Sequence, residues 1–231
     1  MKILASDTST SILTVALCED ERTVAETVAD CGRSHAERML TTVDWVLAEA
    51  GLDLLNVDML AVSAGPGSFT GLRVGVATWK GLALAAGLPL VGVPTLDAMA
   101  RLMPLDAGLV CPLLDAKMGE VFGAVYEFRG GIPYKTQEDM AAPVEVLLGQ
   151  LTGPVHVLGE GATRYRARIE AVLPEAVFVP RKDGTPRASS VAAEARAMLA
   201  RGCPADAERV APVYLRKSQA EETRARAMVR P

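Results

Sequence analysis

Residues 2–28 of the chain read KILASDTSTSILTVALCEDERTVAETV, which is three apolar runs separated by two polar turns. The runs at residues 2–6, 12–18 and 23–28 predict strands, because short apolar runs bounded by turn residues are typical of strands. The polar segments Asp7–Ser11 and Glu19–Arg22 predict the connecting turns, since Asp, Ser and Thr side chains hydrogen-bond nearby backbone groups. We therefore expect the chain to begin with three strands joined by short turns.

After these strands the pattern changes to helices that alternate with single strands. Ser34-His-Ala-Glu37 is a capping box, which predicts the start of a helix, and Gly51 predicts its end. The rest of the first half predicts a strand at 59–63, a helix at 68–86, a strand at 90–93 and a helix at 96–103.

The second half of the chain repeats this order of elements. It predicts strands at 109–114, 120–128 and 132–135, a helix at 143–151, a strand at 155–158, a helix at 163–173, a strand at 177–179 and a helix at 189–201. The first strand of each half is followed by an aspartate, Asp7 or Asp115, and the fourth strand of each half ends in a glycine turn. Such a duplication indicates the fold more strongly than any single element.

We therefore expect an α/β fold of two β-β-β-α-β-α lobes, a duplicated actin-like (ASKHA) architecture whose two Asp turns face the cleft between the lobes. The expected units are residues 1–104 for the N-terminal lobe and 105–212 for the C-terminal lobe. Residues 213–231 are expected to add a strand or helix and a charged tail, with a second capping box at Ser218–Glu221.

The composition is that of an ordinary globular protein. The chain has 231 residues, half of them hydrophobic, and a net charge of -4. Proteins that bind nucleic acid alone usually carry a basic surplus, so the sequence disfavours that class. The four cysteines form no C-x-x-C pair, which argues against a zinc site or a disulfide framework. The N-terminus lacks a signal-peptide core and the apolar stretch 82–93 is broken by Gly and Pro, so we expect a cytoplasmic protein without membrane contact.

The glycine-rich segment Ala64–Gly81, AGPGSFTGLRVGVATWKG, resembles a phosphate-binding loop at first sight. No Lys-Ser or Lys-Thr follows its glycines, and the spacing is one residue too long for G-x-G-x-x-G. Gly67, Gly71 and Gly75 instead recur at every fourth position, which on a helix makes one smooth face for the close approach of another backbone. That backbone belongs to the helix at 34–51, to a second chain, or to both, if the two helices pack together and present a joint surface to the second chain.

The two Asp turns are the candidate nucleotide contacts. Asp7, Thr8, Ser9 and Asp115 would face the cleft, but neither turn begins with the glycine that lets a backbone approach a phosphate closely. Ordinary Asx or Ser/Thr turns are the alternative interpretation. The chain has two histidines, which lie far apart in the sequence, so we expect no metal site.

Several segments together make the chain similar to the bacterial TsaB (YeaZ) family. They are MKILASDTSTSILTVAL, SHAERML, GPGSFTGLRVGVATWKGLALA, LLDAKMGEVFGAVY and PVYLRKSQAE, and they extend over nearly the whole chain. GPGSFTGLRVG is highly specific to this family and its relatives. The resemblance implies the actin-like two-lobe fold and a role in making N6-threonylcarbamoyladenosine on tRNAs that read ANN codons.

The resemblance also implies a division of labour. The paralogous subunit TsaD, once described as a glycoprotease, transfers the threonylcarbamoyl group and carries a His-x-x-x-His metal motif. In this chain Thr95 and Met99 stand where the two histidines would be. We therefore expect a non-catalytic subunit that supports a TsaD-type partner by heterodimerisation and works with a TsaE-type ATPase. ATP and metal are expected on those partners, no tightly bound cofactor is expected here, and tRNA is reached through the complex.

In the family the pairing surface is built from the helices that correspond to residues 34–51 and 68–86, and the same surface allows self-association. Trp and Arg side chains dominate many interfaces, which favours Trp79 and, farther round the helix, Arg73. The expected interface residues are His35, Arg38, Met39, Gly67, Gly71, Arg73, Gly75 and Trp79.

Two other functions remain open. One is a stand-alone enzyme of the actin-like class, either a small-molecule kinase, which needs ATP in the cleft, or a metallopeptidase-like enzyme, which needs a histidine pair. The other is direct tRNA binding by basic residues near the C-terminus, for which a solvated tail is the alternative: Arg216, Lys217, Arg224, Arg226 and Arg230.

Overall fold

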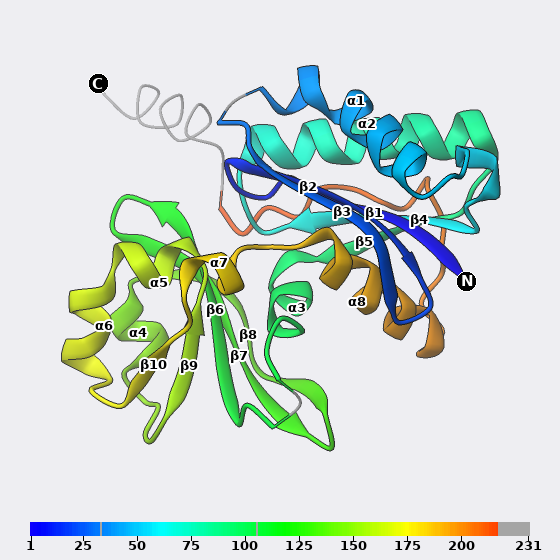
Figure 1. The fold of residues 1–231 in the computed structure, drawn as a ribbon. Coiled ribbons are helices and arrows are strands. Elements are labelled where there is room, and N and C mark those ends of the chain that lie inside the picture. Colours follow the sequence, from blue (N-terminus) through cyan, green and yellow to red (C-terminus); the bar gives the residue numbers. More distant parts are fainter. Residues whose placement is uncertain (33, 105, 217–231) are drawn as a thin grey trace, which may run out of the picture.

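The computed structural model describes residues 1–32, 34–104 and 106–216, which fold into two five-stranded sheets with helices on both sides (Figure 1). The predicted capping box at Ser218–Glu221 and four of the five basic C-terminal residues lie outside the described residues. Within the described residues, no helix combines the length and the hydropathy that a membrane span requires.

The first sheet has the strand order β3-β2-β1-β4-β5. Its strands are β1 (Lys2–Asp7), β2 (Ile12–Glu19), β3 (Arg22–Asp30), β4 (Met59–Gly65) and β5 (Leu90–Pro94). The central strand β1 pairs antiparallel with β2, where Ala5 is opposite Ala16, and parallel with β4, where Ala5 is opposite Ala61. β1, β2 and β4 are buried along nearly their whole length because helices cover both faces of the sheet.

Successive residues of β1 enter two different cores. Leu4 packs with α1 (His35–Glu49) and α2 (Phe69–Ala86), which lie on the face turned away from the second sheet (Figure 1). Ile3 and Ala5 pack on the opposite face against α3 (Thr95–Ala100) and α8 (Ala188–Ala200). The short 3-10 helix η1 (Leu54–Asn56) connects α1 to β4.

The second sheet repeats this topology with the order β10-β9-β6-β7-β8. Its strands are β6 (Leu109–Lys117), β7 (Glu120–Arg129), β8 (Ile132–Ala142), β9 (Val155–Leu158) and β10 (Ala176–Phe178), and the helices beside it are α4 (Val144–Leu148), α5 (Glu160–Arg164), α6 (Arg166–Val172) and α7 (Arg181–Gly184). The equivalence of β1 with β6 and of β4 with β9 confirms the predicted duplication. We call the first sheet with α1, α2 and α8 the first lobe, and the second sheet with α4 to α7 the second lobe.

Helix α8 lies elsewhere than the duplication suggested, since it packs on the first sheet although it follows the second one. Its small buried residues Ala188, Val191, Ala192 and Ala195 pack against that sheet. The Glu26 carboxylate of β3 accepts hydrogen bonds from the Ser189 amide and hydroxyl, both at 3.0 Å, at the start of the helix. The first lobe therefore includes residues from both ends of the chain, while the expected boundary between residues 104 and 105 stays a prediction.

Three local predictions differ from the structure. Ser34 is the N-cap residue of α1, but its side chain makes no capping hydrogen bond. The strand expected at 132–135 extends to Ala142, because β8 pairs with β7 along nearly its whole length. The helix expected at 163–173 divides at Tyr165 into α5 and α6, since that residue departs from helical geometry.

Candidate functional site

A cleft of about 690 Å³ opens between the two lobes. The first lobe lines it with the β1–β2 turn and the start of α2, and the second lobe lines it with the β6–β7 turn and Glu160 of α5. Residues 213–216, which return from α8, line it as well. The two duplicated Asp turns therefore meet at one cavity, as the sequence predicts.

In the first-lobe turn, the Asp7 carboxylate accepts hydrogen bonds from within its own turn. Its Oδ1 accepts hydrogen bonds from the Ser9 amide at 2.9 Å and from the Ser9 hydroxyl at 2.8 Å. Burial raises the pKa of Asp7, which favours its neutral form. Thr8 is also buried, and its hydroxyl donates to the Gly71 carbonyl at 2.8 Å. Of the three predicted contacts in this turn, Ser9 alone lines the cleft.

In the second-lobe turn, Asp115 lines the cleft but is surrounded by donors. Its Oδ1 accepts from the Lys117 amide at 2.9 Å and from the Tyr165 hydroxyl at 3.0 Å. Its Oδ2 lies 2.7 Å from Lys117 Nζ and 3.4 Å from Arg164 Nε. Burial alone would raise the pKa of Asp115, but hydrogen bonds from Lys117 and Tyr165 bring it below its usual value.

Both duplicated carboxylates thus act as acceptors within their own turns. In the part of the chain that the structure describes, no group of three or more His, Cys, Asp or Glu side chains is arranged to hold a metal ion. Thr95 and Met99 are fully buried, and Met99 packs in the core between α3 and the second sheet. The cleft has the volume to hold a small molecule, but Asp7 does not line it, and Asp115 already accepts hydrogen bonds from Lys117 and Tyr165.

The glycine face of α2 packs inside this chain. A Cβ atom added to Gly67 would lie 2.6 Å from the Ser9 carbonyl oxygen, and one added to Gly71 or Gly75 would collide with the carbonyl or hydroxyl oxygen of Thr8. The neighbouring backbone is therefore the β1–β2 turn, and neither the helix at 34–51 nor a second chain lies there. The prediction that these three glycines form a partner interface is wrong, because the turn already occupies their face.

Three further residues of the predicted interface are also buried in the described structure. Trp79 and Met39 are completely buried in the first-lobe core, and His35 is 6% exposed. Met39 and Trp79 lie on the sides of α1 and α2 that cover the sheet, while His35, at the start of α1, lines the cleft between the lobes, so none of the three lies on the outer face of the helices. Arg38 and Arg73 are exposed, as an interface requires.

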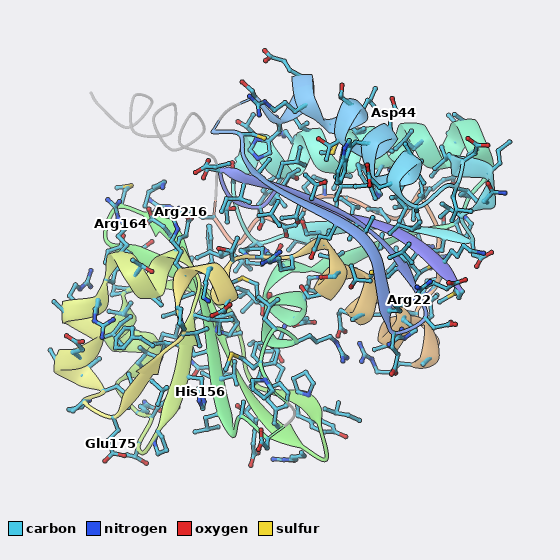
Figure 2. All side chains as sticks on the ribbon, viewed as in Figure 1. Arg22, Asp44, His156, Arg164, Glu175 and Arg216 are labelled. Atoms are coloured by element: carbon cyan, nitrogen blue, oxygen red, sulfur yellow. The ribbon has the colours of Figure 1, made fainter. Side chains whose placement is uncertain are left out.

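The outer face of α1 and α2 carries the exposed apolar residues that sequence reasoning missed. Leu84 is 86% exposed, and Leu40 and Trp45 are each about half exposed. Ala77, Gly81 and Ala85 form a second small-residue stripe on α2, and nothing lies within 4 Å of a Cβ added to Gly81. Figure 2 shows Asp44 on the same outer side of α1. The four-residue spacing at 77, 81 and 85 was the available signal, but the richer glycine stripe at 67, 71 and 75 obscured it.

Comparisons with known proteins agree along nearly the whole chain. The family model described as TsaD, tRNA N6-adenosine threonylcarbamoyltransferase, matches residues 27–224. The tRNA threonylcarbamoyladenosine biosynthesis protein TsaB of Escherichia coli K12 is 35% identical over 95% of this chain and 96% of its own length. TsaB of Bacillus subtilis 168 is 30% identical over 96% of both chains.

The solved structures agree with the sequence comparisons. YeaZ from Pseudomonas aeruginosa is 31% identical, with a TM-score of 0.81 over 93% of this chain and 99% of its own. Component A of (R)-2-hydroxyglutaryl-CoA dehydratase from Acidaminococcus fermentans matches with a TM-score of 0.52 at 13% identity, which supports the fold alone.

Proposed function

This chain belongs to the TsaB (YeaZ) family and takes part in tRNA threonylcarbamoyladenosine biosynthesis, and we propose that it does so as a non-catalytic subunit paired with a TsaD-type transferase. The observation that carries the proposal is the exposed apolar face of α1 and α2 on a chain that matches TsaB over 95% of its length. The complex would bring together this chain, the transferase and a TsaE-type ATPase, with tRNA bound by the assembly.

The state of the cleft supports a non-catalytic role. Asp7 is buried in an Asx turn, and Asp115 accepts hydrogen bonds from Lys117 and Tyr165. Asp7 does not line the cleft, and at Asp115 a metal ion would have to displace these internal donors before it reached the carboxylate. We therefore expect calorimetry with Mg-ATP to detect no tight binding to the isolated chain. Tight, saturable binding would support instead the alternative of a stand-alone kinase.

The outer face of α1 and α2, with Leu84 and Gly81, is the proposed docking face, and its composition supports the partnership. Burying a large apolar side chain such as Leu84 against a partner would stabilise the complex by roughly 25 cal/mol per Å² of apolar surface removed from water. A glycine in the middle of an exposed helix costs about 1 kcal/mol relative to alanine, so Gly81 calls for a compensating close contact. A partner helix packed across Ala77, Gly81 and Ala85 supplies both.

The test is to introduce a charge at this face and measure assembly. We expect Leu84→Asp to weaken binding to the TsaD-type partner at least about tenfold, because an interface would have to desolvate the new carboxylate. Titrating the TsaD-type partner into each variant, with nucleotide and the TsaE-type ATPase present, gives the affinity. Circular dichroism verifies that each variant is folded. Val146→Asp is the matched control, since Val146 is 61% exposed on α4 of the other lobe. Equal affinities for the two variants would reject this face as the docking site.

A further inference from the structure

Residues 203–216 return from α8 along the first lobe toward the mouth of the cleft. Val210 enters the first-lobe core, and its carbonyl accepts from Lys80 Nζ of α2 at 3.0 Å. The Val213 amide donates to the Ala64 carbonyl at the end of β4, at 2.7 Å. A Cβ added to Gly65 would collide with the Val213 carbonyl oxygen, so the segment passes close against the β4–α2 connection.

At the mouth of the cleft this segment is fixed to α2 by an aromatic and cationic cluster. The ring of Tyr214 lies 4.7 Å from that of Phe69, and the Tyr214 hydroxyl accepts from Arg73 Nε at 3.0 Å. The Arg73 guanidinium in turn lies 3.9 Å above the Phe69 ring. Offset aromatic pairs and cation–π contacts of this kind each contribute on the order of 1 kcal/mol.

Two residues later the chain contacts the other lobe. Arg216 Nη1 lies 3.3 Å from Glu120 Oε2 of β7 and 3.5 Å from the Ala116 carbonyl of β6, and Nη2 contacts Met118. Figure 2 shows Arg216 beside the second lobe, although the segment that carries it lies against the first lobe. Tyr214 and Arg216 therefore join the start of α2 to the β6–β7 turn, and both line the cleft.

Elsewhere the lobes are joined through α3, which packs in the cores beside both sheets, and through the chain that runs from α7 to α8. Two lobes joined in this way can move by a hinge or shear motion unless a further connection restrains them. We propose that Val213–Arg216 is a clasp, a further connection that holds the lobes at a fixed separation across the mouth of the cleft. The clasp also links the cleft to the docking face, because Arg73 lies one helical turn before Ala77.

The clasp is tested on the isolated chain by the distance between two spin labels across the cleft mouth. Labels at Ala36→Cys on α1 and Thr163→Cys on α5 use exposed positions, in a Cys203→Ser background where the other cysteines are buried. We expect a single narrow distance distribution, which Arg216→Ala and Tyr214→Ala shift to longer and broader distances. An unchanged distribution in both variants overturns the proposal.

The matched control is Arg209→Ala, which removes an arginine from the same segment. Arg209 forms an ion pair with Asp206 inside the segment and is exposed. We expect this variant to keep the original distance distribution. If it broadens the distribution as much as Arg216→Ala does, the restraint belongs to the whole segment and the clasp at Val213–Arg216 is rejected.

A consequence of the clasp rests on the proposed function. If the partner binds the outer face of α2 more tightly when the clasp is closed, linkage requires that opening the clasp weakens docking. We expect Arg216→Ala to lower the affinity for the TsaD-type partner at least about fivefold, and Arg209→Ala to leave it unchanged. Equal affinities for wild type and Arg216→Ala reject the coupling. A wild-type chain that fails to bind the partner rejects the proposed function, and the spin-label distances still decide the clasp.

Discussion

At the scale of single residues, two glycines of α2 lie in opposite surroundings. Gly71 faces the β1–β2 turn, where a Cβ would collide with the Thr8 carbonyl oxygen, while a Cβ on Gly81 would meet nothing within 4 Å. We expect Gly71→Ala to lower the free energy of unfolding by about 1–3 kcal/mol through overpacking. Gly81→Ala should raise it by about 0.5–1 kcal/mol, because alanine loses less backbone entropy in a helix. Urea unfolding of both variants measures the difference, and equal shifts would contradict the assignment of the two faces.

Asp115 gives a prediction with a defined pH dependence. Its pKa is lower in the folded protein than in the unfolded chain, so its ionised form contributes stability above the unfolded value of 3.8. We expect Asp115→Asn to lose about 1–3 kcal/mol at pH 7, the usual worth of a hydrogen bond to a charged group. This loss should shrink as the pH falls below 3.8, because the unfolded chain becomes protonated first and folded Asp115 follows at its lower pKa. Unfolding measured at pH 7 and near pH 3 tests this, and a pH-independent difference would contradict it.

The spacing of single residues predicted a smooth helix face but not its neighbour. Thr8, which fills that face, lies 63 residues before Gly71 in the sequence. The four-residue period of the glycines predicts that another backbone comes close. Which backbone it is depends on how β1 and α2 pack in the folded lobe. The same limit explains Trp79, which sequence analysis placed at an interface and which points from α2 into the first-lobe core.

At the scale of elements, the docking of α8 depends on one carboxylate of a distant strand. Glu26 accepts from the Ser189 amide and hydroxyl, and its side chain is largely buried. We expect Glu26→Ala to destabilise the protein by about 1–2 kcal/mol, in the range of a lost helix cap. Hydrogen exchange should show the largest loss of protection in the first turn of α8. Glu21→Ala is the control, because Glu21 is highly exposed and pairs with Arg196 at 3.5 Å; a similar loss there would contradict a capping role for Glu26.

The elements themselves were largely predictable, and their partners were less so. The three opening strands, the long helices α1 and α2, and the duplicated order follow from local apolar patterns and turn residues. The position of α8 does not follow, because its small apolar residues fit either sheet and the choice depends on contacts with Ile3 and Glu26 more than 160 residues earlier. Likewise β8 is longer than its sequence suggests, since pairing with β7 extends it through residues of low strand propensity.

At the scale of the whole molecule, the duplication predicted the two lobes and the meeting of their Asp turns. It did not predict that residues after α8 return to the first lobe and reach across the cleft, because nothing in the first half corresponds to that segment. The mouth of the cleft is therefore the place where the two lobes differ most from a simple repeat. Leu40, Trp45 and Leu84 on α1 and α2 stay exposed in this arrangement.

One apolar face can hold one occupant at a time, which leads to a prediction about assembly. If the isolated chain self-associates, we expect it to use the face that carries Leu84 and Gly81, the same face proposed for the TsaD-type partner. Titrating the partner into the isolated chain should then replace the homodimer with a heterodimer, as measured by mass spectrometry under native conditions. Leu84→Asp should abolish both species, and Val146→Asp should abolish neither. A partner that adds to an intact homodimer would show that the two associations use different surfaces. The association that Leu84→Asp abolishes would then be the one that uses the docking face.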